Sequence, residues 1–167
     1  MNTVDALTLR PVTDDDHAFL RRVYASTRRE ELAPLGWPDE MFTAFTAQQY
    51  QAQTAHYWAH YDSSRFCVIE HDGQPIGRFY VDRGSDQIRV VDIALLPEHR
   101  NRGWGTALLE QVLAEGERDG LPVTIHVESF NPAQRLYERL GFRRIDGGND
   151  VYWLLAKQPV GTLQHAG

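Results

Sequence analysis

The sequence contains one cysteine, Cys67, and no apolar run that is long enough to cross a membrane. A single cysteine excludes an intrachain disulfide, which fits a reducing compartment. The apolar neighbours of Cys67 predict a buried small side chain rather than a nucleophile. The first residues show no basic region followed by an apolar stretch, so no export signal is expected. These absences predict a cytoplasmic protein with no membrane partner.

Cationic side chains are in the minority, with 17 Lys and Arg against 23 Asp and Glu, and the formal net charge is −6. Non-specific nucleic-acid binding depends on a basic surface, so this composition argues against a nucleic-acid partner. The same balance favours a cationic substrate such as an amine. The sequence has no repeat, low-complexity stretch or interdomain linker. We therefore expect one domain over residues 1–157, followed by a flexible tail over residues 158–167.

Apolar periodicity and turn residues predict strands and helices in a mixed order. One strand is followed by two helices, three strands, a helix, a strand, a short helix and two strands. The expected strands cover residues 7–12, 65–70, 76–83, 87–96, 123–128, 142–145 and 151–155, and the expected helices cover 13–27, 39–61, 106–119 and 131–140. This order predicts an α/β fold with a mixed sheet of about seven strands and about four helices.

The most informative segment is the heptapeptide Arg100-Asn101-Arg102-Gly103-Trp104-Gly105-Thr106, which joins a predicted strand to a predicted helix. A helix start gathers free backbone N–H groups and the positive end of the helix dipole, which together suit a phosphate. Glycine removes the side chain that would keep a diphosphate from the backbone. The segment is not a Gly-x-x-x-x-Gly-Lys loop, and Leu108 stands where Gly-x-Gly-x-x-Gly needs its third glycine. A plain strand-to-helix turn is the alternative.

Arg100-x-x-Gly103-x-Gly105, preceded by Ile93-Ala94-Leu95-Leu96-Pro97, resembles the acetyl-CoA signature of the GNAT superfamily of N-acetyltransferases. A second block, from Asn131 to Phe142, is similar to the C-terminal Asn-x-x-Ala…Leu-Tyr-Glu-x-x-Gly-Phe segment of that family. The resemblance covers residues 65–155, whereas the first sixty or so residues match only in layout. It implies a single GNAT-like domain that transfers an acetyl group from acetyl-CoA directly to a primary amine.

The resemblance also implies which residues hold the donor. Backbone groups of Leu95 and Leu96 would bind the pantetheine arm and polarise the thioester, and the amides from Asn101 to Thr106 would hold the pyrophosphate. Asn131 would bond the arm, cap the helix that follows it, or do both. The full set of expected cofactor-binding residues is Leu95, Leu96, Arg100, Asn101, Arg102, Gly103, Trp104, Gly105, Thr106, Asn131 and Ala133.

Three residues are candidates for the proton transfers. Tyr137 stands at the family's position for a general acid, and a phenol with a pKa of ~10 can donate to a leaving thiolate; core packing is its alternative role. His126, with an ordinary pKa of ~6.5, stands where the similar ribosomal-protein α-amino acetyltransferases carry a glutamate base. Glu128 is a second candidate base, unless it is a solvated or ion-paired charge.

Other side chains leave several interpretations open. Asp92 lies on a predicted strand, where it could bind water or substrate, and Arg89 occupies about the place of a strand glutamate used by some family members. Glu30 and Glu31 lie near the expected substrate loop. His56 and His60 are one helical turn apart without a third ligand, so no metal is expected. Five aromatic residues could line an acceptor pocket, a dimer face or the core: Trp37, Phe42, Phe45, Tyr57 and Trp58.

Two functions other than acetyl transfer remain open at this level. One is an acyl-CoA-binding sensor or interaction module without significant turnover, and the other is a different nucleotide-binding domain. The sequence does not identify the acceptor, which could be a peptide N-terminus, a lysine, a polyamine, an aminoglycoside or a small amino compound. The general base, the use of acyl groups other than acetyl, and the formation of a homodimer also stay open.

Overall fold

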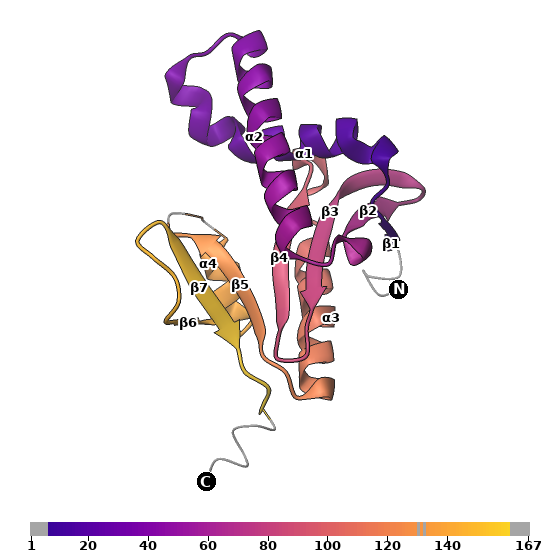
Figure 1. Ribbon diagram of the computed structural model, residues 1–167, viewed down its shortest axis with the longest axis vertical. Helices are drawn as coiled ribbons and strands as arrows, with labels where there is room; N and C mark the ends of the chain where they lie inside the picture. The colour runs from indigo at the N-terminus through magenta and orange to yellow at the C-terminus, as the bar shows by residue number, and fades with distance from the viewer. Residues whose placement is uncertain (1–6, 130, 132, 161–167) are drawn as a thin grey trace. The chain divides into compact units, whose positions relative to one another are not determined.

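Seven strands form one sheet in the order β1-β2-β3-β4-β5-β7-β6 in the computed structural model, which describes residues 7–129, 131 and 133–160 (Figure 1). The pair β4–β5 is parallel, while β1–β2, β2–β3, β5–β7 and β6–β7 are antiparallel. The predicted α/β fold with a mixed sheet and about four helices is confirmed. The strands are β1 (Leu7–Pro11), β2 (Cys67–His71), β3 (Gln74–Arg83), β4 (Ile88–Leu95), β5 (Val123–Glu128), β6 (Arg143–Ile145) and β7 (Tyr152–Lys157), and the helices are α1 (His17–Leu32), α2 (Asp39–His60), α3 (Trp104–Asp119) and α4 (Gln134–Arg139).

The chain divides into two compact units, each of which takes part of β3 and of β4. The first unit comprises Met1–Tyr80 and Asp92–Arg102, and the second comprises Val81–Val91 and Gly103–Gly167. The first unit therefore contains the end of β4 and the residues up to Arg102, and the second unit contains Gly103 and all candidate residues that follow it.

In the first unit, α1 and α2 accompany β1, β2 and the first part of β3. A two-residue turn joins β2 to β3, and its residues Asp72 and Gly73 have φ values of 50° and 79°. Such a turn matches the twist of a hairpin. The helix α2 lies over β3 (Figure 1), where the ring of Tyr57 meets the ring of Tyr80 edge-on at 6.2 Å.

In the second unit, α3 packs on β5 and the hairpin β6–β7 continues the sheet. The parallel pairing of β4 with β5 joins Ile88–Val90 to Val123–Ile125. Gly116 allows a close approach of α3, because a Cβ there would lie 2.8 Å from the carbonyl oxygen of Leu121. Gly120 ends α3 in the left-handed conformation, which favours glycine.

Much of the predicted tail lies outside the described residues, which end at Val160. The amide of Val160 donates to the carboxylate of Glu117 at 2.9 Å. The domain boundary at residue 157 and the flexible tail stay predictions. Among the described helices, none combines the length and hydropathy that a membrane span requires.

Candidate functional site

The glycine-containing turn that follows β4 directs the first amides of α3 outward from the helix start. After the 3-10 turn Pro97–His99, Asn101 and Gly103 adopt φ values of 62° and 81°, and α3 begins at the next residue. Ala107 donates to the carbonyl oxygen of Gly103 at 3.0 Å. The amides before Ala107 therefore have no acceptor within the helix, as the first turn of any helix requires. The local geometry is that of an anion site.

Neither glycine of this turn is explained by contacts within the protein. A Cβ built on Gly103 or Gly105 would meet no atom within 4 Å. At Gly103 the positive φ accounts for glycine. Gly105 has an ordinary helical backbone, so nothing in the described structure requires a residue without a side chain there. Gly105 leaves the backbone accessible, which is the property that a diphosphate needs.

The predicted pantetheine-binding residues already use most of their backbone groups. The amide of Leu96 donates to Ile76 at 2.9 Å, and the carbonyl of Leu96 accepts from His99 at 2.9 Å. The carbonyl of Leu95 accepts from Nε of Arg100 at 2.9 Å, while Arg102 bonds the carbonyl of Glu98 at 3.4 Å. A bound arm would have to use other backbone groups of β4, so the assignments of Leu95 and Leu96 stay predictions.

A buried ion pair lies upstream on β4, still within the first unit. Nη2 of Arg78 donates to Oδ2 of Asp92 at 2.8 Å and to Oε1 of Gln53 at 3.0 Å. The hydroxyl of Tyr57 donates to the same Oδ2 at 3.2 Å. Burial raises the pKa of Tyr57, and the Asp92 carboxylate raises it further, so this hydroxyl remains a donor. Sequence reasoning missed Arg78, although an arginine flanked by apolar residues in the middle of a strand signals a buried partner.

In the second unit, β5 presents the candidate bases on one face. Val123, Ile125 and Val127 are buried, whereas His126 is exposed and Glu128 half-buried. Nη1 of Arg89 donates to Nδ1 of His126 at 3.1 Å, and Nε of Arg89 donates to Thr124 at 2.7 Å. Partial desolvation by its neighbours and then the Arg89 cation lower the pKa of His126.

The contact with Arg89 fixes the tautomer of His126. Since a guanidinium only donates, Nδ1 is the unprotonated nitrogen, and the neutral ring carries its proton on Nε2. His126 can accept a proton at Nδ1 only by giving up this hydrogen bond. The base role of His126 and of Glu128 stays a prediction.

Asn131 forms hydrogen bonds in the turn that precedes α4. Its Oδ1 accepts from the amide of Ala133 at 2.8 Å, and its carbonyl accepts from the amide of Gln134 at 3.2 Å. These bonds shape the turn before α4, whose N-cap residue is Ala133 rather than Asn131, and they already occupy the Ala133 amide. Contact of Asn131 or Ala133 with a cofactor stays a prediction, and Pro132 lies outside the described residues.

Tyr137 on α4 occupies a packed position. Its residue is 6% exposed, and its ring meets Phe142 edge-on at 5.9 Å. The packing role is therefore present, whereas the general-acid role stays a prediction. Gly141 follows α4 with a φ of 100°, as expected for a glycine that ends a helix.

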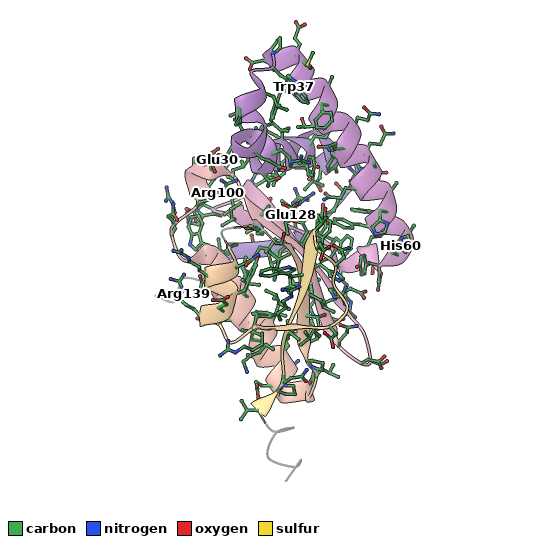
Figure 2. All side chains as sticks on the ribbon, turned by 90° about the vertical axis from the view of Figure 1, so that its left-hand side faces the viewer. Glu30, Trp37, His60, Arg100, Glu128 and Arg139 are labelled. Carbon is green, nitrogen blue, oxygen red and sulfur yellow. The ribbon has the colours of Figure 1, made fainter. Side chains whose placement is uncertain are left out.

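The remaining candidates do not form one site. Figure 2 shows Trp37 and His60 near opposite ends of α2. Trp37 meets Phe45 at 5.0 Å, and Arg29 lies over Phe42 at 4.3 Å, while Trp58 packs against Phe66 at 5.2 Å. A cavity of about 550 Å³ between α1 and α2 is lined instead by His17, Arg21, Ala47, Gln48, Tyr50, Gln51 and Thr54.

The histidine pair and Glu31 have local contacts. His60 contacts the carbonyl of His56 through Nδ1 at 2.9 Å, and Glu31 pairs with Arg28 at 2.8 Å. Glu30 is exposed on α1. Within the part of the chain that the structure describes, no group of three His, Cys, Asp or Glu side chains could hold a metal ion.

Two of the curated relatives that share sequence with this chain illustrate the similarity. Mycothiol acetyltransferase of Nocardiopsis dassonvillei is 38% identical over 64 residues, which cover 38% of this chain and 19% of that protein. The [ribosomal protein bS18]-alanine N-acetyltransferase of Haemophilus influenzae is 28% identical over 100 residues, which cover 59% of this chain and 65% of that protein. The chain thus spans about a fifth of the first relative and just under two thirds of the second.

The fold is shared with a solved structure. PaiA N-acetyltransferase from Thermoplasma acidophilum, crystallised with coenzyme A, superposes with a TM-score of 0.66 at 16% identity, over 91% of this chain and 98% of that one. The model of the acetyltransferase (GNAT) family matches residues 25–142, well over half of the sequence. The chain therefore belongs to the acetyltransferase (GNAT) family.

Proposed function

We propose that this protein is an N-acetyltransferase that moves the acetyl group of acetyl-CoA directly to a primary amine. The observation that carries the proposal is the turn before α3, where Gly103 and Gly105 leave the first helical amides accessible to a diphosphate. Family membership supports acetyl-CoA as the donor, and the amine N-acetyltransferase among the relatives supports nitrogen as the acceptor. Neither comparison favours the sensor without turnover.

The donor end of the reaction needs positive charge and exposed amides. The guanidinium groups of Arg100 and Arg102 lie on exposed side chains next to Gly103 in the chain. Backbone amides from Gly103 to Thr106 would bond the diphosphate, and acetyl-CoA would supply the activated acyl group. Amide donors fixed in a helix start need little reorganisation when the anion binds, which favours affinity.

The transfer itself requires an unprotonated amine and a proton for the leaving thiolate. The amine nitrogen forms the new bond to the carbonyl carbon, the C–S bond breaks, and its electron pair goes to sulfur. We assign the protonation of that sulfur to the hydroxyl of Tyr137, and we keep His126 and Glu128 as the candidate bases. Orientation of the two reactants would supply much of the acceleration, without a covalent enzyme intermediate.

The same proposal includes the cellular compartment, the partners and the assembly of the protein. The presence of a single cysteine, Cys67, and the net charge of −6 support a cytoplasmic protein without a nucleic-acid or membrane partner. Exposed apolar side chains on the hairpin β6–β7 support a homodimer as the assembly to test. These side chains are Ile145, Val151 and Tyr152.

A thiol-release assay tests the activity. Purified protein is mixed with acetyl-CoA and, in turn, a peptide with a free alanine N-terminus, Nα-acetyl-lysine amide, spermidine and glucosamine. We expect amine-dependent release of CoA thiol with at least one acceptor, and a mass increase of one acetyl group on that acceptor. Binding of CoA without acetylation of any amine would support the sensor instead, and the absence of CoA binding would contradict both.

A further inference from the structure

The helices α1 and α2 of the first unit border a cavity that the proposed acetyl transfer does not use. Its volume of about 550 Å³ lies within the range of about 300–1,000 Å³ that is usual for small-molecule sites. His17 and Arg21 are four residues apart, so they lie on one face of α1. Ala47, Gln51 and Thr54 share one face of α2 for the same reason. All of these residues belong to the first unit, so the cavity lies within one compact part of the chain.

The side chains around the cavity are predominantly polar. Among the described residues that line it, only Ala47 is apolar. Gln48 and Gln51 are exposed, and each carboxamide can both donate and accept hydrogen bonds. Cavities that stay empty are apolar, whereas a polar cavity of this size holds water or a ligand. The lining therefore suits a molecule with several hydrogen-bonding groups.

The hydrogen bond between His17 and Tyr50 leaves one donor available in either of its arrangements. Nδ1 of His17 and the hydroxyl of Tyr50 are 2.7 Å apart. If the hydroxyl donates, the neutral imidazole carries its proton on Nε2, and if Nδ1 donates, the hydroxyl keeps its own proton for another acceptor. Burial raises the pKa of Tyr50, so the phenol is protonated at neutral pH. The pair can thus donate one hydrogen bond to a ligand.

The positive charge at the cavity comes from Arg21. Arg28, seven residues later on the same helix, donates to Glu31 at 2.8 Å and to Gln49 at 2.7 Å. By contrast, within residues 7–129, 131 and 133–160, no carboxylate forms an ion pair with Arg21 or lines the cavity. A cation at a polar cavity without a carboxylate favours an anionic ligand. One guanidinium balances one negative charge and fits the two oxygens of a carboxylate, which favours a carboxylate over a phosphate dianion.

We propose that the cavity between α1 and α2 binds a small polar monocarboxylate. Arg21 pairs with the carboxylate, the His17–Tyr50 pair donates a hydrogen bond, and Gln48 and Gln51 bond hydroxyl or amide groups of the ligand. An ion pair on an accessible arginine contributes little by itself, so we expect millimolar affinity. This site is additional to the donor turn, and the inference does not depend on acetyl transfer.

Titrations followed by ¹H–¹⁵N correlation spectra test this site in the absence of acetyl-CoA. The probes are N-acetylglycine, N-acetylglutamine and gluconate, and the control for each probe is its neutral amide. With at least one carboxylate we expect saturable shifts of the backbone amides around Arg21 and Gln51. Its neutral amide should bind about tenfold more weakly or less, because hydrogen bonds to charged groups are the stronger ones. Inorganic phosphate should bind more weakly than that carboxylate.

Three variants separate this site from general attraction of anions. Arg21→Gln removes the cation and should raise the dissociation constant of the carboxylate by about tenfold or more. Arg22→Gln is the matched control, because Arg22 is the adjacent exposed arginine and lies over the ring of Phe19 at 5.6 Å. It should keep the affinity within twofold. Ala47→Leu adds bulk to the lining without a change of charge, so we expect severalfold weaker binding.

Four results would overturn the inference. They are the absence of saturable binding by all three carboxylates, equal binding of the neutral amides, tighter binding of phosphate than of any carboxylate, and equal effects of Arg21→Gln and Arg22→Gln. None of these measurements involves CoA or turnover. Failure of the inference therefore leaves the proposed function intact, and a protein that acetylates no amine would leave this site unaffected.

Discussion

The hydroxyl of Tyr137 can be tested separately from its ring. The residue is 6% exposed and its ring packs on Phe142, and Tyr137→Phe would keep this packing. General acid catalysis typically contributes about 100-fold or more, so we expect kcat to fall by about 100-fold. The dissociation constant of acetyl-CoA should stay within twofold by titration calorimetry. Tyr152→Phe, on an exposed tyrosine of β7, is the control, and an unaltered kcat in Tyr137→Phe across pH would remove the assignment.

The contact between Arg89 and His126 predicts that a substitution of Arg89 changes the pKa of His126. The Arg89 cation disfavours the protonated imidazole, so Arg89→Gln should raise the pKa of His126 toward its ordinary value of about 6.5. NMR titration of the imidazole C–H signals measures this change, with Arg83→Gln as the control because Arg83 pairs with Glu115 instead. If His126 titrates with the same midpoint in the wild type and in Arg89→Gln, the contact between Arg89 and His126 does not persist in solution.

The same depressed pKa has a consequence for stability. Because the unfolded chain protonates His126 more readily than the folded chain, this residue lowers the free energy of unfolding as pH falls below about 6.5. In Arg89→Gln the gap between the folded and unfolded pKa narrows, so this part of the pH dependence should become weaker. Urea titrations at pH 5.5 and pH 7.5 compare the two proteins.

At the level of elements, we expect a substitution at the start of α3 to raise stability and to weaken CoA binding. Gly105→Ala places a methyl group where no atom lies within 4 Å, so helix propensity should stabilise the protein by about 0.5–1 kcal/mol. The same methyl group would stand between the backbone and a diphosphate. We therefore expect a higher urea midpoint together with at least tenfold weaker binding of CoA. Higher stability with unchanged affinity would show that the diphosphate does not approach Gly105.

Elements defined by local signals were predictable from the sequence. The helix α2 and the strand β4 lie within one residue of the expected bounds at each end, because apolar periodicity and turn residues act over a few positions. The glycines at 73, 103 and 141 all adopt the positive φ that their places in turns or at helix ends require. The start of α1 differed, since Asp14–Asp16 form a 3-10 turn before it. Asp16 is held there by Arg10 at 2.7 Å.

The partners of the candidate side chains were not predictable, because they depend on strand register and on helix packing. The sequence placed Asp92 and His126 on strands, but Arg78 reaches Asp92 from β3 and Arg89 reaches His126 from the neighbouring β4. Likewise, the sequence marked Leu96 as a backbone ligand, and only the β3–β4 pairing shows that Ile76 already accepts its amide proton. Short motifs identify the family, whereas long-range contacts determine which groups remain available.

At the scale of the whole molecule, we expect binding of CoA to stabilise the folded protein against unfolding. A ligand at 100 times its dissociation constant stabilises the folded state by about 2.7 kcal/mol, which raises Tm by roughly 5–10 °C in a protein of this size. Differential scanning calorimetry with CoA should show this increase. ATP at the same concentration should produce a much smaller change, and equal stabilisation by ATP would support a different nucleotide-binding function.

The central claim is that main-chain amides at the start of α3 bind the diphosphate of the donor. A ¹H–¹⁵N correlation spectrum recorded during titration with CoA observes these amides directly. We predict saturable shifts of the Gly103, Gly105 and Thr106 amides that are among the largest in the spectrum. Saturation with CoA that leaves these three signals unmoved, or a spectrum that does not respond to CoA, would contradict the account.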